Sequence, residues 1–243
     1  MKLFILFFFS LLLGTFFSQK AELLISGSIF NLSTDSLFIA QSFENNENYD
    51  TIITDQKGNF KASITLPKQD YYVLKAGGSF IHLIIREKNE IKIFGDGRKL
   101  NEFCNIIGSD ESSAMNSFDQ VVRKWKAKSD SALIAINKDQ NKRDEINAYM
   151  SQEYYKFMNK LRSFIGVNQN SAALIIALGS INLDEETDSY ASVLNQVYKS
   201  FPQSYTVQQY KKNFDTHMEM LEAQKPLGIG KEAPDFEELS VNR

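Results

Sequence analysis

The sequence predicts an α+β protein in which an N-terminal antiparallel β-sandwich, residues 19–108, precedes an all-helical domain, residues 109–225. Two observations carry this prediction. Up to about Ile107, apolar and polar residues alternate in short runs separated by turn residues, which is typical of strands with one buried face. Beyond Gly108, apolar residues recur every three or four positions, which is the period of amphipathic helices.

The composition is that of an ordinary globular protein. The chain has 243 residues, 43% hydrophobic and 23% charged, which is long enough for one large or two modest domains. Its net charge is −3 and no region has the basic excess that phosphate binding needs, so nucleic acid is excluded as an expected partner. One local basic cluster falls on a predicted helix with acidic neighbours, which indicates a solvated face; it comprises Arg123, Lys124, Lys126 and Lys128.

Residues 1–18 have the pattern of a secretory signal peptide. Lys2 precedes an apolar run over residues 3–17, and Ser18 offers a small residue for cleavage. The run is shorter than the roughly 20 residues that cross a bilayer. Phe16 stands where a small residue is preferred, so an uncleaved anchor is the alternative. We expect export to the periplasm or cell envelope, with no transmembrane span in the mature chain.

The β-rich part is expected to contain seven or eight short strands. The clearest run places Phe60, Ala62, Ile64 and Leu66 on one face, with polar residues between them. Similar runs occupy residues 23–30, 36–43, 50–54, 71–75, 80–86, 90–94 and 103–107. Turn residues separate them, such as Gly77-Gly78, and this spacing is typical of an antiparallel sandwich.

About five helices are expected over residues 110–224. The first begins near Ser112 and Ser113, either of which could be its N-cap. Residues 172–178 form a short, almost wholly apolar segment, which predicts a buried helix. The longest apolar stripe and the last one comprise Ile146, Met150, Tyr154, Phe157, Leu161 and Phe164, and Val207, Tyr210, Phe214, Met218 and Leu221.

The single cysteine rules out an internal disulfide framework. Cys104 lies in a short stretch of alternating apolar residues, which favours a small buried side chain on a strand. A free reactive thiol and an intermolecular disulfide are the alternatives.

No catalytic, cofactor-binding or metal-binding residue is assigned from the sequence. His82 and His217 are far apart and lack the spacing of metal ligands. The acidic run around Asp184 precedes a predicted helix, where the helix dipole favours carboxylates, so a capping role is expected. Trp125 is expected to anchor the core.

Four aromatic residues near predicted strand ends are candidates for an interaction surface. They are Phe43, Tyr49, Tyr71 and Tyr72. Loops at the ends of a sandwich can bind a partner, so we expect a weak protein-interaction surface there. Packing in the sandwich core is the alternative.

Residues 228–236 read GIGKEAPDF. This run resembles the lead-in of the TlpA/ResA-like and AhpC/TSA-like thioredoxin superfamily. The preceding residues resemble a domain of unknown function found before such enzymes, and the matching blocks are residues 25–29, 50–60, 71–74, 91–96, 108–109 and 168–173. The resemblance implies that residues 226–243 begin a thioredoxin-like domain that is truncated at Arg243, ahead of any Cys-x-x-Cys motif.

The expected function follows from this resemblance. It implies the accessory N-terminal region of an envelope thiol-disulfide oxidoreductase of TlpA/ResA-like type, inactive by itself because two neighbouring thiols are missing. Expected partners are exported protein substrates or envelope proteins, with a homodimer as an open alternative. A non-catalytic envelope binding or protein-interaction module is the competing function, and a gene remnant is a third.

Overall fold

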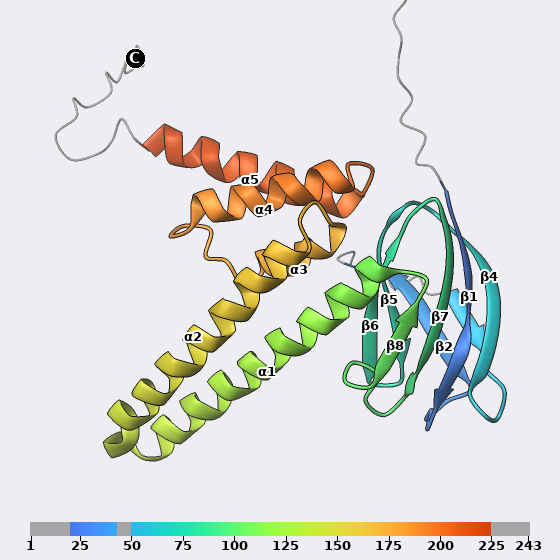
Figure 1. The fold of residues 1–243 in the computed structure, drawn as a ribbon, viewed down its shortest axis with the longest axis horizontal. Helices are drawn as coiled ribbons and strands as arrows, with labels where there is room; N and C mark the ends of the chain where they lie inside the picture. Colours follow the sequence, from blue (N-terminus) through green and yellow to red (C-terminus); the bar gives the residue numbers. More distant parts are fainter. Residues whose placement is uncertain (1–19, 43–49, 225–243) are drawn as a thin grey trace, which may run out of the picture.

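The computed structural model describes residues 20–42 and 50–224 and has an α+β fold (Figure 1). Two four-stranded sheets come first in the chain and an all-helical region follows, in the order expected from the sequence. The expected signal peptide, the expected thioredoxin-like start at residues 226–243, and Phe43 and Tyr49 lie outside the described residues.

The alternating runs of the sequence form eight strands in the described residues. Their bounds are β1 Ala21–Phe30, β2 Ser36–Gln41, β3 Asp50–Ile53, β4 Asn59–Leu66, β5 Asp70–Ala76, β6 Ser79–Ile85, β7 Lys88–Asp96 and β8 Cys104–Ile107. In β4, Phe60 and Leu66 are buried while Lys61 and Thr65 are exposed, so the predicted alternation is confirmed.

The strand order is β4-β1-β7-β8 in the first sheet and β3-β2-β5-β6 in the second. All neighbours pair antiparallel except β1 and β7, which run parallel with Ile25 opposite Ile91. The expectation of a wholly antiparallel arrangement is therefore wrong at this pair. Strands of the second sheet, including β5 and β6, lie between β1 and β7 in the sequence. Strands β1 and β7 are therefore not joined by a tight hairpin and need not run antiparallel.

Both sheets contribute side chains to one buried apolar cluster. Leu23 and Ile93 come from the first sheet, and Leu37, Leu74 and Leu83 come from the second. These residues are at most 1% exposed. Burial of this shared apolar surface is the main force that holds the two sheets together.

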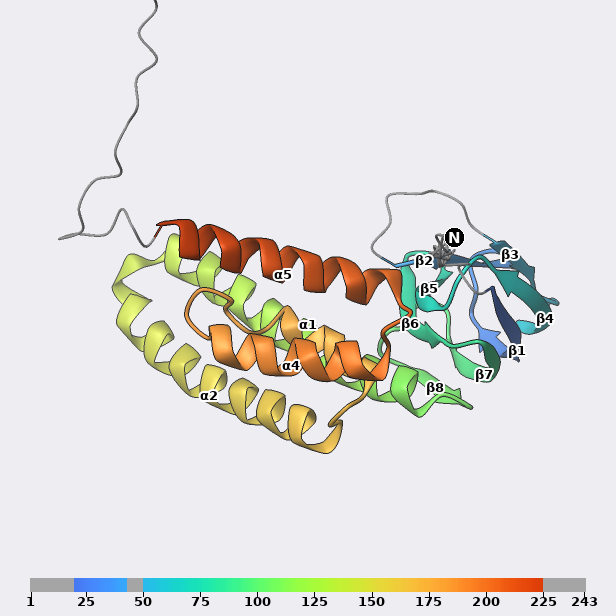
Figure 2. The same cartoon turned by 90° about the horizontal axis from the view of Figure 1, so that it is seen from above.

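Five α-helices follow in the residues that the structure describes, where the sequence predicts about five. Their bounds are α1 Asp110–Lys138, α2 Arg143–Val167, α3 Ile175–Leu178, α4 Thr187–Ser200 and α5 Tyr205–Gln224, with 3-10 turns at Gln140–Lys142 and Ala172–Leu174. Helices α1 and α2 form a long antiparallel arm that points away from the sheets, while α4 and α5 lie alongside each other (Figures 1 and 2). None of the helices described is long and apolar enough to cross a membrane.

The N-cap of α1 is Ser109, so the prediction of Ser112 or Ser113 is wrong. The Ser109 hydroxyl accepts a hydrogen bond from the Ser112 amide at 3.3 Å. The helix starts earlier than expected because Asp110 and Glu111, which favour the positive end of the helix dipole, form its first turn. Ser112 is thereby placed inside the helix, facing the sheet.

A second buried cluster fills the space between the helices and the outer side of the second sheet. Its members include Tyr71 and Ile84 from the strands and Leu174, Leu194 and Val207 from the helical region. Aromatic stacking extends this cluster along the arm, where Trp125 packs on Phe157 with ring centroids 5.3 Å apart. Trp125 is only partly buried, but it packs against this core as expected.

Candidate functional site

Helix α1 covers the edge strand of the second sheet with polar side chains. The Asn116 side chain accepts a hydrogen bond from the His82 amide at 2.9 Å and donates one to the His82 carbonyl at 2.7 Å. The Ser112 hydroxyl accepts a bond from the Ile84 amide at 2.9 Å. An uncovered edge strand invites pairing with other chains. Along β6, the side chains of Ser112 and Asn116 supply hydrogen-bond partners that a neighbouring strand would otherwise supply.

An ion pair joins the β6–β7 turn to three helical segments. Arg86 donates two hydrogen bonds of 3.0 and 2.7 Å from Nη2 to the Glu111 carboxylate, and Nη1 donates to the Ser200 carbonyl at 2.8 Å. Its guanidinium lies 4.1 Å from the centroid of the Phe201 ring. Glu111 also accepts a bond from the Ala172 amide at 2.8 Å. The Arg86–Glu111 pair therefore holds together α1, the start of the 3-10 turn at Ala172 and the end of α4.

A fully buried carboxylate joins the second sheet to α5. Asp70 on β5 accepts hydrogen bonds from the Ser204 hydroxyl at 2.5 Å and from the Gln41 amide group at 2.6 Å. The Thr206 amide at the start of α5 lies 3.3 Å from both carboxylate oxygens. A carboxylate is stabilised there because the first amides of a helix are free to donate and carry positive partial charge.

The structure corrects the interaction surface expected at Tyr71 and Tyr72. Both are buried, with 0% and 1% exposure. Strand β5 lies between β2 and β6, and both faces are covered. Tyr72 therefore packs in the core between the sheets, and Tyr71 packs in the core under the helices. Two successive strand residues point to opposite faces, so both can be buried only in a strand covered on both sides.

The hydroxyl groups of these two tyrosines have structural partners. Tyr71 donates a hydrogen bond to the Ala172 carbonyl at 2.8 Å, and Tyr72 donates one to the Lys68 carbonyl at 2.8 Å. Burial raises the pKa of Tyr71 well above its ordinary value. The joint between sheet and helices, formed by Asp70, Tyr71, Arg86, Glu111 and Asn116, replaces the predicted binding surface at this place.

The remaining residues singled out in the sequence are spread over the fold. Cys104 is mostly buried beside the first core, and burial raises the pKa of its thiol to about 12, which fits the small buried side chain expected there. Burial also lowers the pKa of His82. His217 Nε2 lies 3.2 Å from Asp184 Oδ1. In the described part of the chain, no group of three or more His, Cys, Asp or Glu side chains is arranged to hold a metal ion.

The capping role expected of the acidic run is not seen before α4. The N-cap of this helix is Glu186, whose side chain makes no capping hydrogen bond. Asp184 lies beside His217 of α5 instead. Only Asp188 falls within the first turn. The position of the Asp184 carboxylate depends on the packing of α5 against this loop. Sequence spacing does not reveal that packing.

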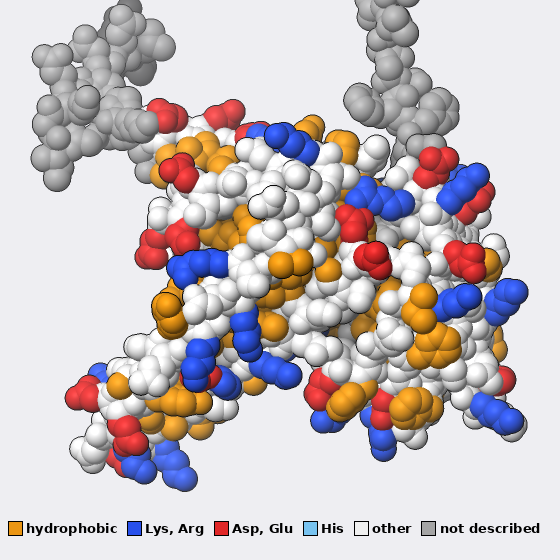
Figure 3. All heavy atoms as spheres, viewed as in Figure 1, with side chains coloured by type: hydrophobic (Ala, Val, Ile, Leu, Met, Phe, Trp, Pro, Cys, Tyr) orange, Lys and Arg blue, Asp and Glu red, His pale blue; other side chains and the backbone are white. Residues whose placement is uncertain are grey.

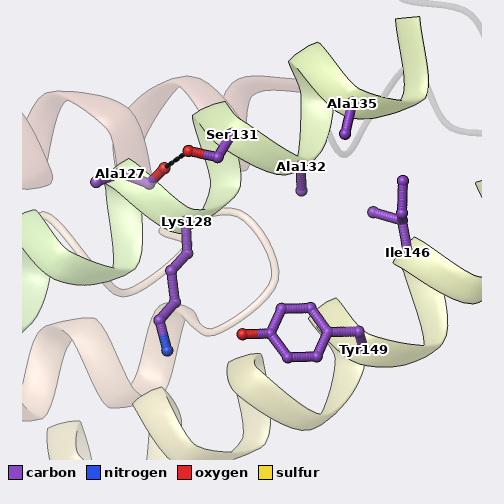
Figure 4. A pocket seen from close by; sticks show the side chains of 7 residues that line it. All are labelled: Ala127, Lys128, Ser131, Ala132, Ala135, Ile146 and Tyr149. Atoms are coloured by element: carbon purple, nitrogen blue, oxygen red, sulfur yellow. Dashed lines mark hydrogen bonds between the residues drawn. The ribbon is translucent and has the colours of Figure 1, made fainter. Parts of the chain in front are cut away.

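An open apolar groove lies between α1 and α2, towards the far end of the arm (Figure 4). It has a volume of about 430 Å³ and is lined by Ala127, Lys128, Ser131, Ala132, Ala135, Ile146 and Tyr149. The Ser131 hydroxyl donates to the Ala127 carbonyl at 2.7 Å, so it is satisfied within the helix. Sequence reasoning missed this groove because most of its lining on α1 is small residues, which add little to an apolar stripe.

The charge at the edge of the groove is neutralised locally. The Lys128 ammonium pairs with the Glu153 carboxylate, which also accepts a bond from Lys156 at 2.7 Å. These two lysines lower the pKa of Glu153 to about 2. The groove is therefore apolar along its length, with a fixed ion pair at one end.

The fold defines a two-part α+β protein whose sheets and helices are joined by buried polar contacts. No protein-family model matches the chain, and no curated protein matches it. Among solved structures, the crystal structure of a DUF3823 family protein from Parabacteroides merdae is similar, at 13% identity and a TM-score of 0.24. The match covers 32% of this chain and 46% of that chain, which is less than half of that protein's length. The comparisons give no support to the thioredoxin-like relationship that residues 228–236 predict.

Proposed function

We propose that the chain is the accessory region of an exported TlpA/ResA-like thiol-disulfide oxidoreductase, and that it holds the residues after α5 in a fixed direction. The oxidoreductase part of this proposal rests on the resemblance of residues 228–236 to a thioredoxin-like lead-in, and the positioning part rests on the polar joint between sheet and helices. A region that merely linked two domains would not need a buried carboxylate and a buried tyrosine bonded across its two parts. Bending at the joint would break these hydrogen bonds and leave buried polar groups without partners. Because this costs free energy, the contacts oppose bending.

The chain path adds support to a positioning role. Asp70 binds the start of α5, and the helix then runs 20 residues to Gln224. The segment that resembles a thioredoxin-like lead-in begins four residues later, at Gly228. A rigid helix anchored at its first turn would set where such a domain begins. We also infer that the two sheets pack face to face as a sandwich, since both contribute to one buried cluster.

The experiment is an intact-mass measurement of the native product, purified from its own cell envelope, with its thiols counted after reduction. A product heavier than 27.7 kDa by a domain, with two further cysteines in a Cys-x-x-Cys motif, is expected. Reduction of insulin by that product would establish the activity of the parent. A product whose only cysteine is Cys104 would overturn the oxidoreductase assignment.

A non-catalytic envelope binding module is the second candidate, and an exposed apolar patch on the first sheet favours it. Phe94 and Ile107 lie on its outer face, on neighbouring strands, with 44% and 49% exposure. Phe30 and Phe103 are more than half exposed nearby. Figure 3 shows hydrophobic side chains on the face that carries β7 and β8. Replacement of Phe94 by Ser should abolish binding of an envelope partner and leave the fold intact if this function is correct.

A further inference from the structure

The first half of α1 carries a polar stripe where it lies against the edge strand β6 (Figure 1). Its members recur at steps of three and four residues, which places them on one face of the helix. They are Ser112, Asn116, Asp119 and Arg123. The first two are buried and form the hydrogen bonds to the β6 backbone described above. The other two form an ion pair, with 2.5 Å between Arg123 Nε and Asp119 Oδ2.

The imidazole of His82 lies under this stripe. Alternate residues of a strand share a face, so His82 points the same way as Phe80 and as Ile84, which packs under the helices. Its Nδ1 atom is buried and has no hydrogen-bond partner among the residues that the structure describes. The imidazole packs edge-on against the Phe80 ring at 5.3 Å between centroids, and the Arg123 guanidinium lies 4.8 Å from the centroid of the same ring. A cation therefore already belongs to the small cluster that surrounds the imidazole.

The charged groups that act on the imidazole come from α1. Burial has the largest effect and lowers the pKa of His82 below its ordinary value of 6.5, while Asp119 raises this pKa and Arg123 lowers it. On β5, Lys75 lies opposite Phe80 in the sheet register. Because Asp119 already pairs with Arg123, a protonated imidazole would have to share one carboxylate with the guanidinium.

We propose that His82 is an acid-sensitive latch between β6 and α1: the neutral imidazole lets the helix lie on the strand, and protonation of the imidazole loosens the helix from it. A proton on the ring puts a second positive charge beside Arg123, and a buried charge is costly unless it is paired. The cost is relieved when α1 moves away and water reaches the ring. Since the amide and carbonyl of His82 both bind Asn116, this movement breaks those two hydrogen bonds as well.

The direction of the pH dependence follows from the lowered pKa. Between about pH 6.5 and the folded-state pKa, the opened state binds the proton and the closed state does not. The latch is therefore fully stable above about pH 6.5 and weakens as the pH falls below it. Opening uncovers the edge of β6, and an uncovered edge strand can pair with another chain. This inference concerns the joint alone and does not depend on the oxidoreductase proposal.

The test measures amide hydrogen exchange of the purified chain by NMR at pH 7 and pH 5. Rates are expressed as protection factors, so that the intrinsic effect of pH on exchange cancels. Protection of the His82 and Ile84 amides, which bind α1, should fall by about threefold to tenfold between the two pH values. At pH 5 their exchange should not respond to low concentrations of denaturant, because a local opening exposes little surface. Exchange that responds as strongly as that of the Ile25 amide, in the other sheet, would mean global unfolding and would overturn the proposal.

The two histidines of the chain provide matched variants. His82→Gln replaces the imidazole with a side chain that stays neutral, so the fall in protection between pH 7 and pH 5 should disappear. His217→Gln removes the other histidine and should leave the fall unchanged. A fall that persists in His82→Gln, or a wild-type chain that shows none, would overturn the latch.

A second pair of variants keeps the imidazole and changes the charges around it, so the test stands even if His82→Gln does not fold. The NMR titration of the His82 ring gives its pKa directly. Asp119→Asn should lower this pKa below the wild-type value, and Arg123→Gln should raise it. A role in packing alone would give no such opposite shifts. The same pKa in all three proteins would show that α1 does not act on the imidazole, and the proposal would be wrong.

Discussion

Asp70 on β5 accepts a 2.5 Å hydrogen bond from the hydroxyl of Ser204, which lies 134 positions later in the chain. Both residues are completely buried. This contact brings the first turn of α5 onto the second sheet. It makes the helical region and the sheets one structural unit, and the predictions below test that joint and the groups around it.

Replacement of Asp70 by Ala should destabilise the protein strongly. The substitution leaves the Ser204 hydroxyl and the Thr206 amide without their buried acceptor, and each such loss costs about 1–3 kcal/mol. Chemical denaturation should therefore show a loss of at least about 2 kcal/mol in the free energy of unfolding. Asp50→Ala, at an exposed strand position, is the control. Equal effects of the two changes would show that the buried bonds contribute nothing.

Tyr71→Phe tests the corrected role of this tyrosine. The change keeps the ring but leaves the Ala172 carbonyl without its 2.8 Å hydrogen bond, so a loss of about 1–3 kcal/mol in unfolding free energy is expected. Tyr72→Phe is a matched variant on the other face of the strand, since it removes the bond to Lys68 within the core of the sheets. If Tyr71 instead belonged to an exposed binding surface, Tyr71→Phe would leave stability unchanged.

Cys104 should react slowly in the folded protein. Burial raises the pKa of its thiol to about 12, and the thiolate is the reactive form. Alkylation at pH 8 should therefore be slower in the native state than in the denatured state by roughly 100-fold or more. The measurement is the rate of iodoacetamide labelling with and without denaturant. Similar rates in the two states would show an accessible thiol and restore the reactive alternative.

Glu153 should make stability depend on pH in the acidic range. Lys128 and Lys156 lower its pKa from 4.5 to about 2 in the folded state. A lowered folded-state pKa means that the stabilisation is complete above about pH 4.5 and is lost as the pH falls towards 2. Glu153→Gln should therefore lower unfolding free energy at pH 6 and have a diminishing effect towards pH 2. A difference between the two proteins that stays constant over this range would contradict the prediction.

Much of the fold could be predicted from local patterns. The alternation at Phe60 and Leu66 placed β4 correctly, and the apolar run that begins at Ala172 was correctly expected to be buried. These signals are readable because a strand or helix repeats its buried positions at a fixed interval. The groove of the arm has no such signal, since a row containing alanine and serine does not stand out in an apolar pattern.

Local sequence patterns did not predict the contacts between helices and strands. Ser112 was expected to cap its own helix, yet it bonds to the Ile84 amide across the joint. Tyr71 was expected at an exposed strand end, yet it reaches Ala172, 101 positions later. Each of these outcomes depends on which element packs alongside, and residues far apart in the chain decide that.

The sequence by itself predicted seven or eight strands followed by about five helices, in that order, and the face that strands such as β4 bury. Those properties follow from side-chain periodicity within a few residues. Only the tertiary structure decided that β7 runs parallel to β1, that β5 is covered on both faces and that α1 covers the edge of β6. The physical reason is that pairing and burial depend on surfaces meeting in space, and periodicity says which face is apolar without saying what will cover it.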